Sequence, residues 1–112
     1  MGQGPHHKLA IKMQQDLQSI MELLPETKVV FSGIAARRIW RAARHPSAVN
    51  KSRIRINTQI QNFMEKNGGA VVLHKNIASK TEGLFRWDGI HFTEKGNDLF
   101  LGNIQRGLKE LL

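Results

Sequence analysis

Apolar residues recur at steps of three and four positions along two stretches of the chain, which predicts two amphipathic helices. The first covers residues 8–24 and ends at Pro25, because proline cannot continue a helix. The second covers residues 47–67, with Ser47 as its expected N-cap and Gly68-Gly69 as its end. The predicted buried stripes are Leu9, Met13, Leu17, Ile20 and Leu24 in the first helix, and Val49, Ile56, Ile60 and Phe63 in the second.

Each helix is followed by a short apolar run of the kind that forms a buried parallel strand. These runs are residues 28–32 and 70–73. Residues 74–90 are predicted to form a loop with one apolar cluster, Leu84, Phe85 and Trp87. Thr93 is the expected cap of a last helix, with Glu94 in its first turn. The inner face of that helix is predicted to hold Asn97, Leu101, Ile104, Leu108 and Leu111 or Leu112.

Helices that alternate with strands predict an α/β layer architecture with a right-handed crossover. The order is helix, strand, helix, strand, loop, helix, which gives two parallel strands and three main helices. The expected organisation is a flexible start at residues 1–7 and one domain at 8–112. Two strands make a thin sheet, so we expect apolar strand edges that favour self-association.

The composition excludes several kinds of site and favours one kind of partner. The 112 residues contain no cysteine, which excludes disulfides and a Cys/His zinc site, and nothing in the sequence implies another cofactor or metal. No apolar run reaches the length of a membrane span or forms a signal peptide, so no membrane partner is expected. An intracellular location, cytoplasmic or nuclear, fits these features. The net charge of +8 favours an acidic partner such as nucleic acid.

The short sequence Asp88-Gly89-Ile90-His91 lies just before the last predicted helix. In serine hydrolysis a neutral imidazole takes the hydroxyl proton, and a carboxylate fixes the tautomer of that imidazole. Three residues apart on a tight turn, Asp88 and His91 are close enough to touch. We therefore treat them as a candidate acid–base pair, with an ordinary loop aspartate and surface histidine as the alternative.

The segment from about residue 8 to the end resembles the C-terminal half of the SGNH (GDSL-like) esterase family. The resemblance rests on a helix, proline and strand at 25–32, the next crossover at 47–73, and Trp87-Asp88-Gly89-Ile90-His91-Phe92 before the last helix. It is most similar to the SGNH-like domains of vertebrate retroelement-type proteins, which share the stretch from Trp40 to Pro46. The resemblance implies a flavodoxin-like three-layer α/β/α fold, of which this chain holds a part. It also implies that Asp88 and His91 are the acid and base of an ester hydrolase.

The family's nucleophile block, Gly-Asp-Ser, and its Gly-x-Asn-Asp block have no counterpart in the sequence. Ser32 is the one serine at the carboxyl end of a predicted strand, where open α/β sheets place function, but a strand-end serine with a satisfied hydroxyl is the simpler interpretation. The main hypothesis is a truncated or degenerate hydrolase-like domain that is not catalytic alone. The first alternative is part of an active ester hydrolase completed by a missing N-terminal segment.

A basic connector follows the first predicted strand and gives the second alternative, a small nucleic-acid-associated module. Arginine side chains can fork onto phosphates and a tryptophan can stack on a base. A solvated basic face without a partner is the other interpretation. If the connector is helical, Arg37, Arg41 and Arg44 share one face. His45 and His74 are expected to be turn and loop residues. The candidate anion-binding residues are Arg37, Arg38, Trp40, Arg41, Arg44, Lys51, Arg53 and Arg55.

Overall fold

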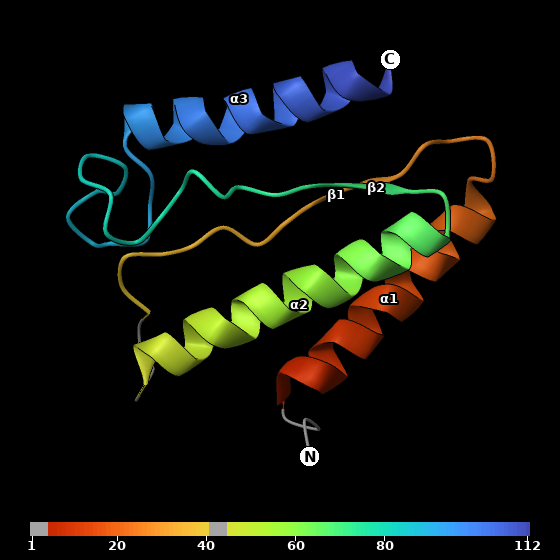
Figure 1. Cartoon of the computed structure of the whole chain (residues 1–112), viewed down its shortest axis with the longest axis horizontal. Coiled ribbons are helices and arrows are strands. Elements are labelled where there is room, and N and C mark those ends of the chain that lie inside the picture. Colours follow the sequence, from red (N-terminus) through yellow and green to blue (C-terminus); the bar gives the residue numbers. More distant parts are fainter. Residues whose placement is uncertain (1–4, 41–44) are drawn as a thin grey trace.

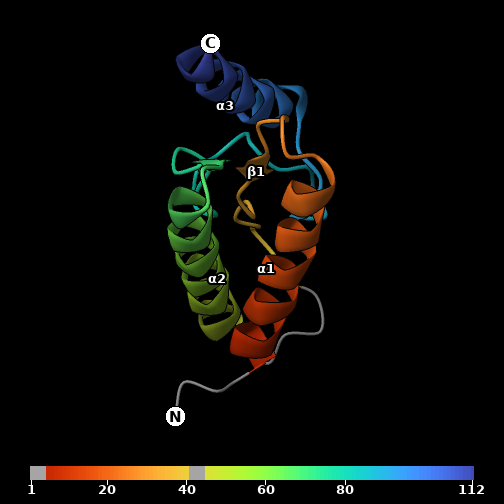
Figure 2. The ribbon, with the colours of Figure 1, turned by 90° about the vertical axis from the view of Figure 1, so that its right-hand side faces the viewer.

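The computed structural model describes residues 5–40 and 45–112, which form three helices and two strands. The elements are α1 (Pro5–Leu23), β1 (Val30–Ser32), α2 (Pro46–Lys66), β2 (Ala70–Val72) and α3 (Glu94–Leu111) (Figure 1). The strands pair in parallel, with Val30 opposite Ala70 and Ser32 opposite Val72. Helices α1 and α2 lie on one side of the strands and α3 on the other (Figure 2). The predicted class, a partial three-layer α/β/α fold with two parallel strands, is confirmed.

Two helices begin earlier than the sequence pattern predicted, and each begins at a proline. Helix α1 starts at Pro5 instead of residue 8, and α2 starts at Pro46 with His45 as its N-cap. Ser47 lies inside the helix, so its prediction as the cap was wrong. Proline is favourable at the first helical position because its missing N–H has no partner there in any case, and its fixed φ suits the helix. The expected serine cap is therefore not needed for this start.

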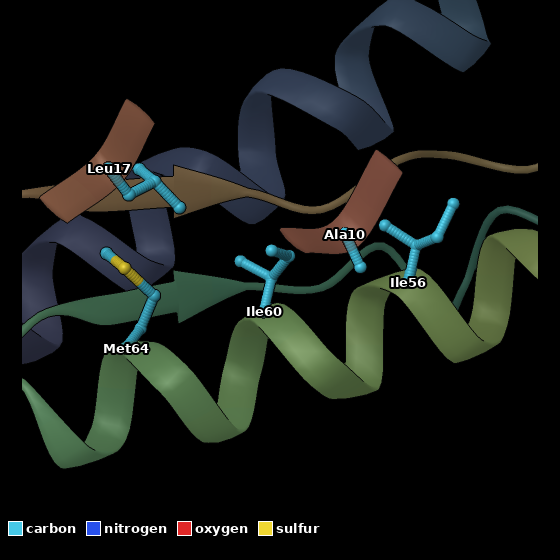
Figure 3. Close-up of a cluster of buried hydrophobic side chains, with 5 residues drawn as sticks. All are labelled: Ala10, Leu17, Ile56, Ile60 and Met64. Carbon is cyan, nitrogen blue, oxygen red and sulfur yellow. The ribbon is translucent and has the colours of Figure 1, made fainter. Parts of the chain in front are cut away.

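The larger core cluster joins α1 to α2 beneath the strands. Ala10 and Leu17 of α1 lie against Ile56, Ile60 and Met64 of α2 (Figure 3). The predicted stripe on α2 is thus confirmed at its centre. The stripe on α1 was wrong for Leu9, Ile20 and Leu24, which are exposed, while Ala10, Met13, Leu17 and Met21 face inward. The small side chain of Ala10 fits the close contact between the helices, a feature that apolar periodicity does not reveal.

Helix α3 also presents a different face from the predicted one. Asn97, Leu101, Leu108, Leu111 and Leu112 are exposed, and Ile104 is half-buried. The inward face holds Gly96, Leu99, Phe100, Asn103 and Gly107. A Cβ on Gly96 would collide with the Leu84 carbonyl oxygen, and one on Gly107 would collide with the Val72 side chain. The backbone of α3 therefore comes close to Leu84 and Val72 at these two glycines, and this contact determines which face of the helix points inward.

A second, smaller core lies between the long loop and α3. Leu84 and Phe85 are buried there with Ile77, and Phe92, Leu99 and Phe100 pack against them. Trp87, which we predicted to belong to this apolar cluster, is 88% exposed. Thr93 caps α3 as predicted, since its side chain accepts a hydrogen bond from the Gly96 N–H at 3.2 Å. Among the described helices, none combines the length and the apolar character that crossing a membrane requires.

Candidate active site

The loop that carries Asp88 and His91 is closed like a hairpin just before α3. Phe85 and Phe92 form an antiparallel bridge, and the Arg86 N–H donates to the His91 carbonyl oxygen at 2.7 Å. Gly89 sits at the tip with a φ of 71°, in the left-handed region that glycine adopts without strain. The loop is thus held at its base by the smaller core and turned at its tip by one glycine.

Asp88 and His91 touch, as the three-residue spacing predicted. The Asp88 Oδ2 lies 2.6 Å from His91 Nδ1. The other carboxylate oxygen, Oδ1, accepts the backbone N–H of Ile90 at 2.9 Å and of His91 at 3.0 Å. The hydrogen bond from the His91 side chain, followed by the two backbone hydrogen bonds, holds the pKa of the Asp88 carboxyl well below its usual range. Asp88 is therefore ionised throughout the physiological pH range.

An ionised carboxylate only accepts hydrogen bonds, so the ring nitrogen that faces Asp88 must carry a proton. This places the proton of a neutral His91 on Nδ1 and leaves a lone pair on Nε2. The His91 side chain is 73% exposed, whereas the Asp88 side chain is only 13% exposed. Within residues 5–40 and 45–112, His91 Nε2 has no hydrogen-bond partner. The arrangement is that of a base oriented by a carboxylate, with its free nitrogen turned to solvent.

The first part of the basic connector packs against this loop. The backbone N–H groups of Arg38 and Ile39 both donate to the Gly89 carbonyl oxygen at 3.0 Å. Residues 33–40 are not helical, so the conditional prediction of one arginine face on a helix does not hold for Arg37, and Arg41 and Arg44 lie outside the described residues. Arg37 is exposed with its guanidinium carbon 5.3 Å from the ring centroid of Trp40. The backbone of the connector at Arg38 and Ile39 thus contacts the loop that carries the candidate acid–base pair.

The rest of the predicted basic set lies on α2 and is divided between two environments. Lys51 and Arg55 are exposed, whereas Arg53 is half-buried. The Arg53 Nε donates to Asn50 Oδ1 at 2.9 Å and its Nη1 donates to the Ile34 carbonyl oxygen at 3.0 Å. Burial lowers the pKa of Arg53. Of these three residues on α2, Lys51 and Arg55 are therefore open to solvent, while Arg53 is tied to the protein.

A second histidine, for which the sequence predicted only a place in a loop, is the buried centre of a polar network whose outer members, Ser32, Asn76 and Arg106, are exposed. His74 follows β2, is 6% exposed and stacks on Phe100 with ring centroids 4.2 Å apart. Its Nε2 lies 2.9 Å from the Ser32 Oγ, and its Nδ1 lies 3.1 Å from the Asn103 Nδ2. The hydroxyl of Ser32 is thus satisfied at the end of β1. The pairing of Ser32 with His74 follows from the parallel register of β1 and β2, which the sequence did not fix residue by residue.

The neighbours of Asn103 decide which nitrogen of His74 carries the proton. Asn103 Nδ2 also donates to Asn76 Oδ1 at 2.7 Å, while Asn103 Oδ1 accepts from Asn76 Nδ2 and from the Arg106 guanidinium. Arg106 can only donate, so it fixes the amide with its NH₂ group towards His74. His74 Nδ1 must then accept, and a neutral His74 carries its proton on Nε2. In this tautomer the ring donates to the Ser32 Oγ and does not accept the serine proton.

No known family and no curated protein matches the sequence. The esterase domain of the ORF1 protein from the zebrafish ZfL2-1 retrotransposon matches the structure with a TM-score of 0.77 at 19% identity, over 96% of this chain and 65% of that one. A GDSL-like lipase from Bacteroides thetaiotaomicron matches with a TM-score of 0.68 at 18% identity, over 92% of this chain and 54% of that one. The chain therefore has the fold of part of a GDSL-like hydrolase domain, as the sequence resemblance predicted.

Proposed function

We propose that this chain is a degenerate or partial SGNH-type hydrolase domain that retains an acid–base pair, Asp88 and His91, but has no working nucleophile and is not catalytic alone. The observation that carries the proposal is the contrast between the Nδ1 partners of two histidines, a carboxylate for His91 and an amide NH₂ for His74. From these partners we infer a lone pair on His91 Nε2 and an N–H on the His74 nitrogen that faces Ser32. The 112 residues also contain no Gly-Asp-Ser block.

A short-chain aryl ester is the test substrate. We expect no hydrolysis by the 112-residue chain above the rate in buffer, because the nucleophile and the oxyanion donors carry most of the rate in serine hydrolases. The matched variants are His91→Ala, Asp88→Asn and Ser32→Ala. A turnover that disappears in all three variants would overturn the proposal and identify Ser32 as the nucleophile.

The alternative is that Asp88 and His91 serve an active ester hydrolase completed by a segment outside these 112 residues. Both structural neighbours are longer than this chain, which spans 65% and 54% of them. Helix α3 also exposes an apolar row, Leu101, Leu108 and Leu111, of the kind that a further segment or a second copy would cover. Mapping the start of the transcript tests this: an in-frame Gly-Asp-Ser upstream, with activity that depends on His91, would favour the alternative.

Self-association is the related proposal for the chain by itself, since its strands have few neighbours and α3 exposes Leu101 and Leu108. Light scattering after size exclusion, at several protein concentrations, measures the oligomeric state. We expect the apparent mass to rise with concentration and a Leu101→Glu/Leu108→Glu variant to lower it. A monomer at every concentration would remove this proposal.

A second candidate function is weak binding of single-stranded nucleic acid by the connector. The exposed Arg37 and Arg38 beside the half-buried Trp40 favour it. Removing one phosphate-binding side chain should reduce the slope of log affinity against log salt by about 0.7. Arg37→Gln/Arg38→Gln should therefore flatten the slope, while Lys109→Gln, at the far end of α3, should leave it unchanged. Binding that does not depend on salt would exclude the connector.

A further inference from the structure

A cavity of about 460 Å³ lies between α2 and the segment that leaves β2. Arg53, Ile54 and Asn57 line it from α2, and residues 73–75 and 77–79 line it from the segment after β2. Neither Asp88 nor His91 lines the cavity, so it is distinct from the candidate active site. Its volume is within the range of small-molecule sites.

The charges around this cavity are of one sign. Arg53 and Lys75 are its charged residues, and no aspartate or glutamate lines it. Arg53 is half-buried and held by Asn50 and the Ile34 carbonyl through Nε and Nη1. Within residues 5–40 and 45–112 no carboxylate forms a salt bridge with it, and residues 1–4 and 41–44 contain no acidic side chain. A partly buried cation without a counter-ion is costly unless an anion supplies one.

Apolar side chains form the rest of the wall. Ile54 comes from α2, and Leu73 and Ile77 come from the segment after β2. A site with one fixed guanidinium, a second cation and hydrocarbon walls suits a ligand with an anionic head and a compact apolar body. The Lys75 side chain is exposed, so it can move to contact the anionic group of the ligand. Arg53, in contrast, is held in place by its two hydrogen bonds.

We propose that this cavity binds a small organic anion, with its carboxylate or phosphate group on Arg53 and Lys75 and its hydrocarbon part against Ile54, Leu73 and Ile77. The proposal is independent of ester hydrolysis, because neither member of the candidate acid–base pair takes part. His74 also lines the cavity, so its ring reports on occupancy.

The experiment titrates the full 112-residue chain with butyrate and with phenyl phosphate, followed by amide and imidazole NMR shifts. Butyramide, which is close to butyrate in shape but uncharged, is the matched ligand control. We expect butyrate or phenyl phosphate to shift the signals of His74, Leu73 and Ile77. Arg53→Gln should weaken binding by about tenfold or more, the cost of one charge-assisted hydrogen bond.

Lys66→Gln is the matched protein control, because Lys66 is exposed on the same helix and does not line the cavity. It should bind the anions as the unaltered chain does. If Arg53→Gln does not fold, Lys75→Gln and the preference for butyrate over butyramide carry the test. Equal binding of butyrate and butyramide, anion binding that survives Arg53→Gln, or no shift with either anion would overturn the proposal. Comparing the two anions then shows whether the head group is preferably a carboxylate or a phosphate.

Discussion

His91 and His74 each have a polar partner on Nδ1, yet the two rings are prepared for opposite roles. A carboxylate accepts from His91 Nδ1 and leaves Nε2 able to take a proton. An amide NH₂ donates to His74 Nδ1 and leaves Nε2 as a donor to Ser32. Burial separates them as well, since His91 is exposed and His74 is not. In this protein the partner of Nδ1 determines whether Nε2 of a histidine can accept a proton. A nearby serine alone does not make the ring a base.

The largest expected contrast comes from the same substitution at the two histidines. His74→Ala removes the ring stacked on Phe100 and leaves the Asn103 donor without its acceptor, so we expect a loss of about 2–4 kcal/mol in the free energy of unfolding. His91→Ala removes an exposed side chain and should leave the melting temperature almost unchanged. Urea unfolding of both variants measures the difference. Equal losses would contradict the division into a structural and a surface histidine.

A second contrast concerns the glycine that shapes the loop of His91. Gly89→Ala should cost about 1–2 kcal/mol for the left-handed backbone, with an added cost because its Cβ would lie 2.5 Å from Ile39. Gly83→Ala is the matched control, with a φ of 82° but no atom closer than 3.8 Å. Thermal unfolding of the two variants isolates the Ile39 contact. A larger loss of stability in Gly83→Ala than in Gly89→Ala would show that the close contact between Gly89 and Ile39 does not constrain the loop.

The buried ring of His74 should make the stability of the fold depend on pH. Burial lowers the pKa of His74 from its ordinary value of 6.5, so below about pH 6.5 the unfolded chain binds a proton that the folded chain excludes. This contribution to stability is complete above that pH and is lost as the pH falls towards the lowered pKa. We expect His74→Phe, compared with the unaltered chain by unfolding at several pH values, to weaken this dependence. An unchanged pH profile would mean that the pKa of His74 is the same in the folded and the unfolded chain.

The smallest expected effect is the position of one proton. Nitrogen chemical shifts should place it on Nε2 of His74 and on Nδ1 of His91 when the rings are neutral. Asn103→Asp puts a carboxylate opposite His74 Nδ1 and should move the proton to that nitrogen, which makes the two histidines alike. Reactivity of Ser32 towards a fluorophosphonate should then rise, with Asn103→Asp/Ser32→Ala as the control. A His74 proton that stays on Nε2 in Asn103→Asp would contradict the role assigned to Asn103, which is to determine the tautomer of His74.

The sequence predicted the order of the elements and the contact of Asp88 with His91, because both depend on residues close along the chain. The inward faces of α1 and α3 were wrong because small residues, Ala10, Gly96 and Gly107, set the close approaches there. The network around His74 was missed for a related reason. Ser32, His74 and Asn103 come from three elements, and their meeting depends on strand register and on the rotation of α3.

The Gly89 carbonyl, which accepts the N–H groups of both Arg38 and Ile39, has a kinetic consequence. Lifting the connector breaks both hydrogen bonds at once, and a movement of the loop tip away from the connector breaks the same two. The two segments should therefore open as one cooperative unit, although about fifty residues separate them in the chain. Deuterium uptake at the Arg38 and Ile39 amides would then follow the opening rate of the loop that holds His91, and would report on that loop from a distant part of the sequence.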